Sequence, residues 1–118
     1  MKKIYYYFYR KYDLILDWFF LKYKNPYKFN PQGNCPVQDE GQLKDGNYYF
    51  FRARGSSWSF EVSTKPFGPL EDVSNFFDNV IWRFEDRKYC DWPKAGWISR
   101  RKAIKLEKFA LEEYYKNK

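Results

Sequence analysis

The sequence predicts a single α+β domain, in which an antiparallel sheet of three to four strands is packed by a long N-terminal helix and a C-terminal helix. Apolar and polar residues alternate in residues 35–63 and again in 80–89, which is typical of half-buried strands. Helical spacing of apolar residues marks both ends of the chain. With 118 residues, of which 25% are aromatic, the chain can bury a hydrophobic core without the help of disulfides or structural metal ions.

Residues 1–24 are expected to form an aromatic N-terminal helix. Apolar residues recur there every three or four positions, in one helical stripe: Ile4, Phe8, Tyr12, Ile15, Phe19 and Tyr23. Further aromatic residues lie off this stripe, so the helix either lies in the core or presents Tyr5, Phe8 and Trp18 to a partner protein. A strand through Tyr5–Tyr9 is a lesser alternative. Proline and glycine then mark residues 25–34 as a linker to a basic α+β domain, residues 35–118.

Two turn signals divide residues 35–63 into a three-stranded meander. Asp45-Gly46 favours a hairpin, because this dipeptide accepts the positive φ angles of a tight turn. If Gly55-Ser56 form the next loop, one face becomes apolar throughout: Tyr49, Phe51, Ala53, Trp58, Phe60 and Val62. The register of the first strand, about Val37 to Leu43, depends on loop length. Either Asp39 or Glu40 is expected opposite Arg52.

The rest of the chain is expected to contain a turn, a short helix, a fourth strand and a final helix. Pro69 followed by acidic residues predicts a helix start, with the helix ending near Phe77. Residues 80–89 alternate as a fourth strand, and residues 90–98 form an aromatic loop. Ser99 is a good N-cap for a helix over 100–115 with this buried stripe: Ala103, Leu106, Ala110, Leu111 and Tyr114.

Composition excludes several functions. The chain has no histidine, which removes the commonest general base and metal ligand, and no glycine-rich phosphate loop is present. We therefore expect no enzyme, no metal and no cofactor. Cys35 and Cys90 match no metal-ligand spacing and are expected to be free thiols, with a disulfide as the alternative. Charged residues interrupt the apolar N-terminal run too early for a signal peptide or membrane span, so a cytoplasmic protein is expected.

The net charge of +7 is concentrated in the two terminal segments. Residues 1–30 hold seven Lys/Arg against two Asp, and residues 99–118 hold seven against three Glu, whereas residues 31–98 are slightly acidic. A near-neutral sheet with basic ends suits a polyanion or an acidic protein surface as partner, although solubility alone also explains it.

Two groups of residues are candidates for binding a nucleic acid or a partner. On the strand, Tyr48, Phe50, Arg52 and Arg54 share one face, where aromatic rings could stack bases and arginines could hold phosphates. The alternative is an arginine ladder paired to Asp39 or Glu40 and Glu61. In the final helix, cations of the first turn oppose the helix dipole, which favours an anionic partner unless the charges are merely tolerated: Arg100, Arg101 and Lys102. Lys105 and the loop residues Trp92 and Trp97 complete the candidates.

Three stretches, CPVQDEG, YYFFRARGSSWSFE and DWPKAGWIS, resemble a group of small uncharacterised proteins of phages, plasmids and other mobile elements. The resemblance covers about residues 34–115. In that group the final helix tends to begin with acids after the serine, whereas Arg100, Arg101 and Lys102 stand there in this chain. The resemblance implies a mobile-element context and supplies no mechanism.

We therefore expect a small, basic, non-catalytic binding protein that engages nucleic acid or a nucleoprotein complex. A mobile-element inhibitor of a host defence system, such as an anti-CRISPR protein, or an accessory subunit would be a concrete form of it. The alternative is a protein–protein module that docks through its aromatic N-terminal helix.

Overall fold

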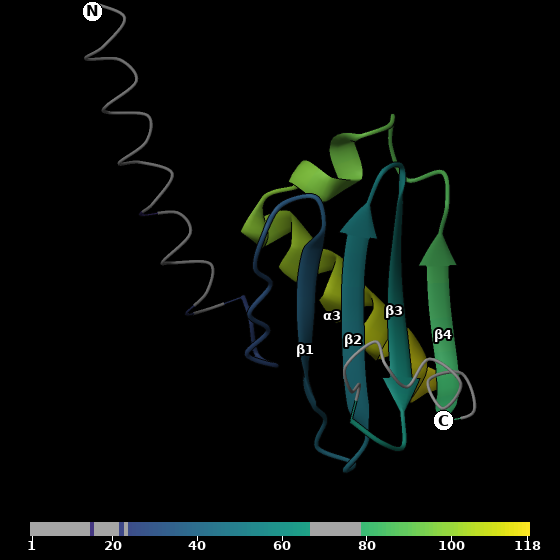
Figure 1. Cartoon of the computed structure of the whole chain (residues 1–118). Coiled ribbons are helices and arrows are strands. Elements are labelled where there is room, and N and C mark those ends of the chain that lie inside the picture. The colour runs from purple at the N-terminus through teal and green to yellow at the C-terminus, as the bar shows by residue number, and fades with distance from the viewer. Residues whose placement is uncertain (1–14, 16–21, 23, 67–78) are drawn as a thin grey trace, which may run out of the picture.

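The computed structural model of the chain describes residues 15, 22, 24–66 and 79–118. Within 24–66 and 79–118, an antiparallel sheet is backed by the long C-terminal helix (Figure 1). The predicted sheet and C-terminal helix are confirmed. The predicted N-terminal helix, with Tyr5, Phe8 and Trp18, lies almost wholly outside the described residues. So does the short helix that was expected to end near Phe77.

Four strands form a meander in which each strand pairs with its sequence neighbour. They are β1 (Val37–Gln42), β2 (Tyr48–Arg54), β3 (Ser57–Ser63) and β4 (Val80–Asp86), and every pair is antiparallel. Short turns connect β1 to β2 and β2 to β3, which is possible because the neighbouring strands are antiparallel. The sheet therefore has two edges, β1 and β4 (Figure 1).

The β2–β3 hairpin has the predicted register. Arg54 pairs with Ser57, Phe51 with Phe60 and Tyr49 with Val62 around the two-residue turn. Gly55 has a φ of 65°, a left-handed conformation that favours glycine. The predicted apolar face is buried at every position: Tyr49, Phe51, Ala53, Trp58, Phe60 and Val62.

The register predicted between β1 and β2 is wrong. Gln38 lies opposite Arg52, while Asp39 faces Phe51 and Glu40 faces Phe50. The loop has three residues, because the Leu43 N–H donates to the Asn47 carbonyl (2.7 Å). Gly46, at φ 90°, takes the left-handed third position of this loop. Compared with a two-residue turn, this shifts β1 by one residue and turns Asp39 toward the apolar face.

Helix α3 (Arg100–Lys116) crosses behind all four strands and covers the apolar face (Figure 1). The Ser99 hydroxyl accepts a hydrogen bond from the Lys102 N–H (3.2 Å), which confirms the predicted N-cap. Most of the predicted stripe is buried, whereas Leu106 is half-buried. The buried side chains of α3 are Ala103, Ile104, Glu107, Ala110, Leu111 and Tyr114.

Residues 25–34 also contribute to the core. Phe29 is buried with its ring 5.3 Å from that of Tyr49 and 6.4 Å from that of Phe60. Gln32 and Gln38 exchange two backbone hydrogen bonds of 2.8 and 2.9 Å along the outer edge of β1. This segment therefore covers one end of the helix–sheet interface and one edge of the sheet.

Two acidic side chains meet between the sheet and α3. Asp39 is buried, and its Oδ2 accepts hydrogen bonds from the Asn30 N–H (2.9 Å) and the Tyr49 hydroxyl (3.1 Å). Glu107 is fully buried, and neither of its carboxyl oxygens has a hydrogen-bond partner in the part of the chain that the structure describes. Burial, and then the nearby charge of Asp39, raise the pKa of Glu107 to about 11. Glu107 is therefore neutral at physiological pH.

We predict that Glu107 makes the protein less stable as the pH rises. The folded protein retains a proton that the unfolded chain releases above pH 4.5, the ordinary pKa of the side chain. By about pH 7 this costs on the order of 3 kcal/mol of unfolding free energy. Glu107→Gln is always neutral, so its unfolding free energy from urea titrations should exceed that of the wild type increasingly from about pH 5 to about pH 8.

Glu112→Gln is the matched control, because Glu112 is exposed on the same helix. It should follow the wild-type pH dependence. A constant difference between Glu107→Gln and the wild type across this pH range would show that Glu107 does not hold its proton in the folded state.

Candidate functional site

One end of the sheet brings together segments that are distant in sequence. We call it the η2 end and define it as residues 54–56 and 87–102; it includes the short 3-10 helix η2 (Lys94–Trp97). The Ala95 N–H donates to the Gly55 carbonyl (3.0 Å), and the Tyr89 N–H donates to the Ser56 carbonyl (3.0 Å). Figure 1 shows this region capping the sheet where β2 ends and β3 begins. Backbone hydrogen bonds thus hold the loop after β4 against the β2–β3 turn.

Two glycines permit this close packing. A Cβ atom on Gly96 would lie 2.9 Å from the Cys35 Cα, and the Cys35 N–H donates to the Gly96 carbonyl (2.6 Å). A Cβ on Gly55 would lie 3.1 Å from the Trp92 Cδ1. Cys90, within the η2 end, and Cys35, which packs against Gly96, carry free thiols. Trp92 is therefore held beside the β2–β3 turn and η2 beside residue 35.

The η2 end exposes two indole rings. Trp92 is 77% exposed and Trp97 is 61% exposed, whereas Trp58 in the core is 3% exposed. Tryptophan is large and apolar, so rings left this open on a well-packed scaffold are typical of surfaces that contact a partner.

Cations surround these rings. Residues 87–105 contain seven Lys/Arg and one acid, Asp91. The ion pairs of this segment include Arg87 with Glu85 (3.3 Å) and Lys94 with Asp91 (4.0 Å). Arg87, Lys94 and Asp91 are exposed, so these pairs neutralise little of the local field. Arg54, at the end of β2, adds another exposed cation.

The first turn of α3 holds two of its cations against uncharged partners. The Arg100 Nη2 donates to the Asn30 Oδ1, and the Lys102 Nζ lies 5.5 Å from the centre of the Tyr89 ring. No acid lies in this turn. These contacts orient the side chains without cancelling their charge, and the positive end of the helix dipole adds to it.

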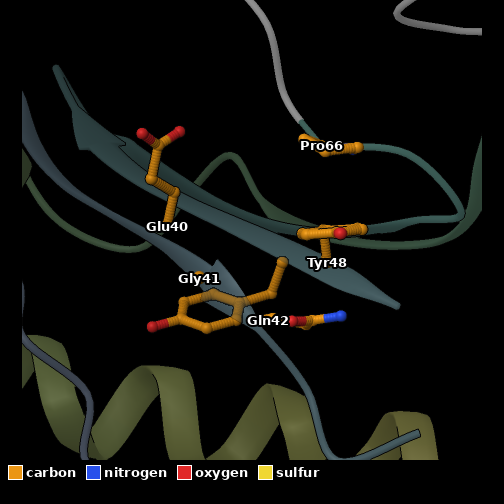
Figure 2. A pocket seen from close by; sticks show the side chains of 6 residues that line it. Glu40, Gly41, Gln42, Tyr48 and Pro66 are labelled. Carbon is orange, nitrogen blue, oxygen red and sulfur yellow. The ribbon is translucent and has the colours of Figure 1, made fainter. Parts of the chain in front are cut away.

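The outer sheet face around Tyr48 and Phe50 is acidic by comparison. Phe50 lies between Glu40 on β1 and Glu61 on β3 in the strand register. Tyr48 and Pro66 line a hollow of about 300 Å³. Figure 2 shows the Glu40 carboxylate beside it, directed away from α3. The exposed carboxylate of Glu40 makes the surface beside Phe50 less suited to a polyanion than the η2 end.

The arginine ladder predicted on this face is not formed. Gln38 and Ser59 are the cross-strand neighbours of Arg52, and its Nε has no hydrogen-bond partner among the described residues. Glu61 instead pairs with Arg83 on β4 (3.3 Å). The one-residue shift of β1 explains the first difference, and the arrival of β4 beside β3 explains the second.

The structure thus separates the predicted site residues into two groups. Those that gather at the η2 end are Arg54, Trp92, Trp97, Arg100, Arg101 and Lys102, with Lys105 one turn further along α3. Arg52 lies two residues before Arg54 on β2, on the outer face of the sheet. Tyr48 and Phe50 lie toward the other end of the same strand. Sequence reasoning missed Arg87, Lys88 and Lys94, which a charge count over residues 87–105 would have found.

No protein-family model, curated protein or solved structure matches this chain. Within the described residues, no cluster of three or more Cys, Asp or Glu could hold a metal ion. None of the helices described is long and apolar enough to cross a membrane.

We predict that Gly96→Ala displaces η2. The added Cβ meets the backbone of residue 35, which cannot move aside as a flexible side chain would. Overpacking of this kind costs about 1–3 kcal/mol, which a lower thermal unfolding midpoint would report. Lys94→Ala, at an exposed position of the same helix, should leave the midpoint nearly unchanged. Equal midpoints for Gly96→Ala and Lys94→Ala would contradict the close approach of the two backbones.

Proposed function

We propose that the protein is a non-catalytic binding protein that holds single-stranded nucleic acid at the η2 end. The observation that carries the proposal is the pairing of two exposed tryptophans with a segment of seven cations and one acid. Bases stack on exposed aromatic rings, while lysine and arginine contact the phosphates between them.

Single strands fit this surface better than a duplex. An indole ring can stack only on a base whose face is free, and the bases of a duplex already stack on each other. Exposed rings at the end of a rigid sheet suit a flexible strand that can wrap around them.

The surrounding charges support the same proposal. Arg100 and Lys102 are oriented by Asn30 and Tyr89, which leaves their charge available to phosphate. At the opposite end of the sheet, charges of both signs lie together: Asp45 is paired with Lys118 (2.9 Å), beside the exposed Lys44, whereas cations outnumber acids seven to one in residues 87–105. A polyanion is therefore attracted to the η2 end in preference to the other end.

The resemblance to mobile-element proteins extends the proposal to a biological setting. A small binding protein of this kind could act on a nucleoprotein complex of a host defence system, as an inhibitor or as an accessory subunit. The exposed η2 end is the surface through which it would reach nucleic acid in such a complex. The alternative is docking to a partner protein through Tyr5, Phe8 and Trp18. It predicts that substitutions at the η2 end leave binding unchanged.

The first test is a titration with a fluorescein-labelled thymidine oligonucleotide of about 15 nucleotides, followed by fluorescence anisotropy. We predict binding whose affinity falls steeply with salt, because phosphate contacts release counterions. Trp92→Ala and Trp97→Ala should each lose about 1–3 kcal/mol of binding free energy. A duplex of the same length should bind more weakly.

Charge reversal provides the second arm. Replacing Arg100, Arg101 and Lys102 together with Glu should reduce both affinity and the slope of its salt dependence. Acids at a helix N-terminus favour the helix dipole, so loss of binding could not be ascribed to loss of α3. For a charge-matched comparison, Arg100→Glu alone is set against Lys44→Glu, in the exposed β1–β2 turn at the other end of the sheet, which should leave binding nearly unchanged. Affinity that is insensitive to salt and to all these η2-end variants would refute the proposal.

A further inference from the structure

The two edges of the sheet differ in how they are covered. Gln32 occupies the outer edge of β1 through two backbone hydrogen bonds to Gln38. On the outer edge of β4, none of the described segments pairs with the strand. Each of its seven residues keeps some exposure, whereas β2 and β3 both contain fully buried residues. An edge of this kind offers its backbone N–H and C=O groups to another strand.

Apolar side chains lie beside this open edge on both faces. Ile81 is 52% exposed on the outer face. On the helix face, the half-buried ring of Phe84 lies 5.5 Å from that of Phe109, which is itself 47% exposed. Pairing of another strand with β4 would cover these side chains as well as satisfying the backbone.

Charges alternate along the outer face of the same strand. Arg83 contacts Glu61 (3.3 Å) and Glu85 (3.2 Å), and Arg87 contacts Glu85 (3.3 Å). An antiparallel copy of the strand reverses this order. If the two strands cross at Phe84, Arg83 lies opposite Glu85 of the partner subunit, and the reciprocal pair forms on the other side of the crossing point.

We propose that a second copy of this chain pairs with β4 in antiparallel fashion, with Phe84 on the two-fold axis. Moving the register by two residues would place Arg83 opposite Arg83 of the partner subunit, or Glu85 opposite Glu85 of the partner subunit. Like charges directly opposite each other destabilise a strand pair. Of these three registers, which all keep both α3 helices on the same face, only the one centred on Phe84 matches opposite charges.

The resulting interface is isologous and modest in size. It consists of one seven-residue strand from each copy and the apolar side chains of Phe84 and Phe109 near the axis. We therefore expect a weak dimer that depends on protein concentration, below the usual size of stable interfaces. The inference does not depend on nucleic-acid binding. Because the strands are antiparallel, the η2 ends of the two copies lie at opposite ends of the joined sheet.

Sedimentation equilibrium of the full chain over a concentration series tests the dimer. We expect an apparent mass that rises toward twice the monomer mass as the concentration increases. Glu85→Arg places like charges opposite each other in the proposed register and should weaken association at least tenfold. Its intramolecular partners Arg83 and Arg87 are exposed, so we expect its thermal midpoint to change little.

Disulfide trapping tests the register independently. In a Cys35→Ser/Cys90→Ser background, Phe84→Cys should form a covalent dimer on mild oxidation, because directly opposite residues of antiparallel strands lie within disulfide range. Ile81→Cys is the control, since it is exposed on the same edge but lies away from the axis. A chain that remains monomeric at the highest concentration overturns the proposal. So does cross-linking at Ile81→Cys that equals or exceeds that at Phe84→Cys.

Discussion

Packing of α3 against the apolar face of the β2–β3 hairpin is the interaction on which the rest of the structure depends. The largest fully buried side chains come from these three elements: Phe51, Phe60, Val62, Ile104, Glu107 and Leu111. Strand alternation directs every second side chain of β2 and β3 to one face, and the stripe of α3 covers that face. Once this layer is formed, the described residues still offer the outer sheet face, the β4 edge, the ends of the sheet and the outward face of α3 for contact with other molecules.

The same layer connects the core to the candidate surface. Asn30 donates its backbone N–H to Asp39 at the helix–sheet interface and accepts a hydrogen bond from Arg100 through its side chain. Asp39 in turn lies close enough to Glu107 to raise the pKa of that residue. A short polar path therefore joins the buried acids to the first turn of α3. It gives the basic η2 end a fixed position relative to the core.

Sequence reasoning predicted the parts that local rules determine. The β2–β3 register followed from a two-residue loop and strict alternation, and the start of α3 followed from Ser99. The register of β1 could not be obtained, because Asp45-Gly46 also fits a three-residue loop with Gly46 in third place. Glu107 was missed since a carboxylate within a helical stripe is ordinarily expected to face solvent. The η2 end depends on hydrogen bonds between residues some 30 or more positions apart, such as Ser56 with Tyr89, which no local pattern encodes.

The most direct test of the central claim is a residue-level map of binding by amide chemical shifts. A 15N-labelled sample of the full chain would be titrated with an unlabelled single-stranded thymidine oligonucleotide. We predict that the backbone amide signals of residues 54–56 and 87–102 shift on titration. The side-chain indole N–H signals of Trp92 and Trp97 should shift with them. Trp58, buried in the core, serves as the internal control. Perturbations centred instead on Tyr48 and Phe50, or an absence of perturbation at saturating oligonucleotide, would contradict the assignment of the η2 end as the binding surface.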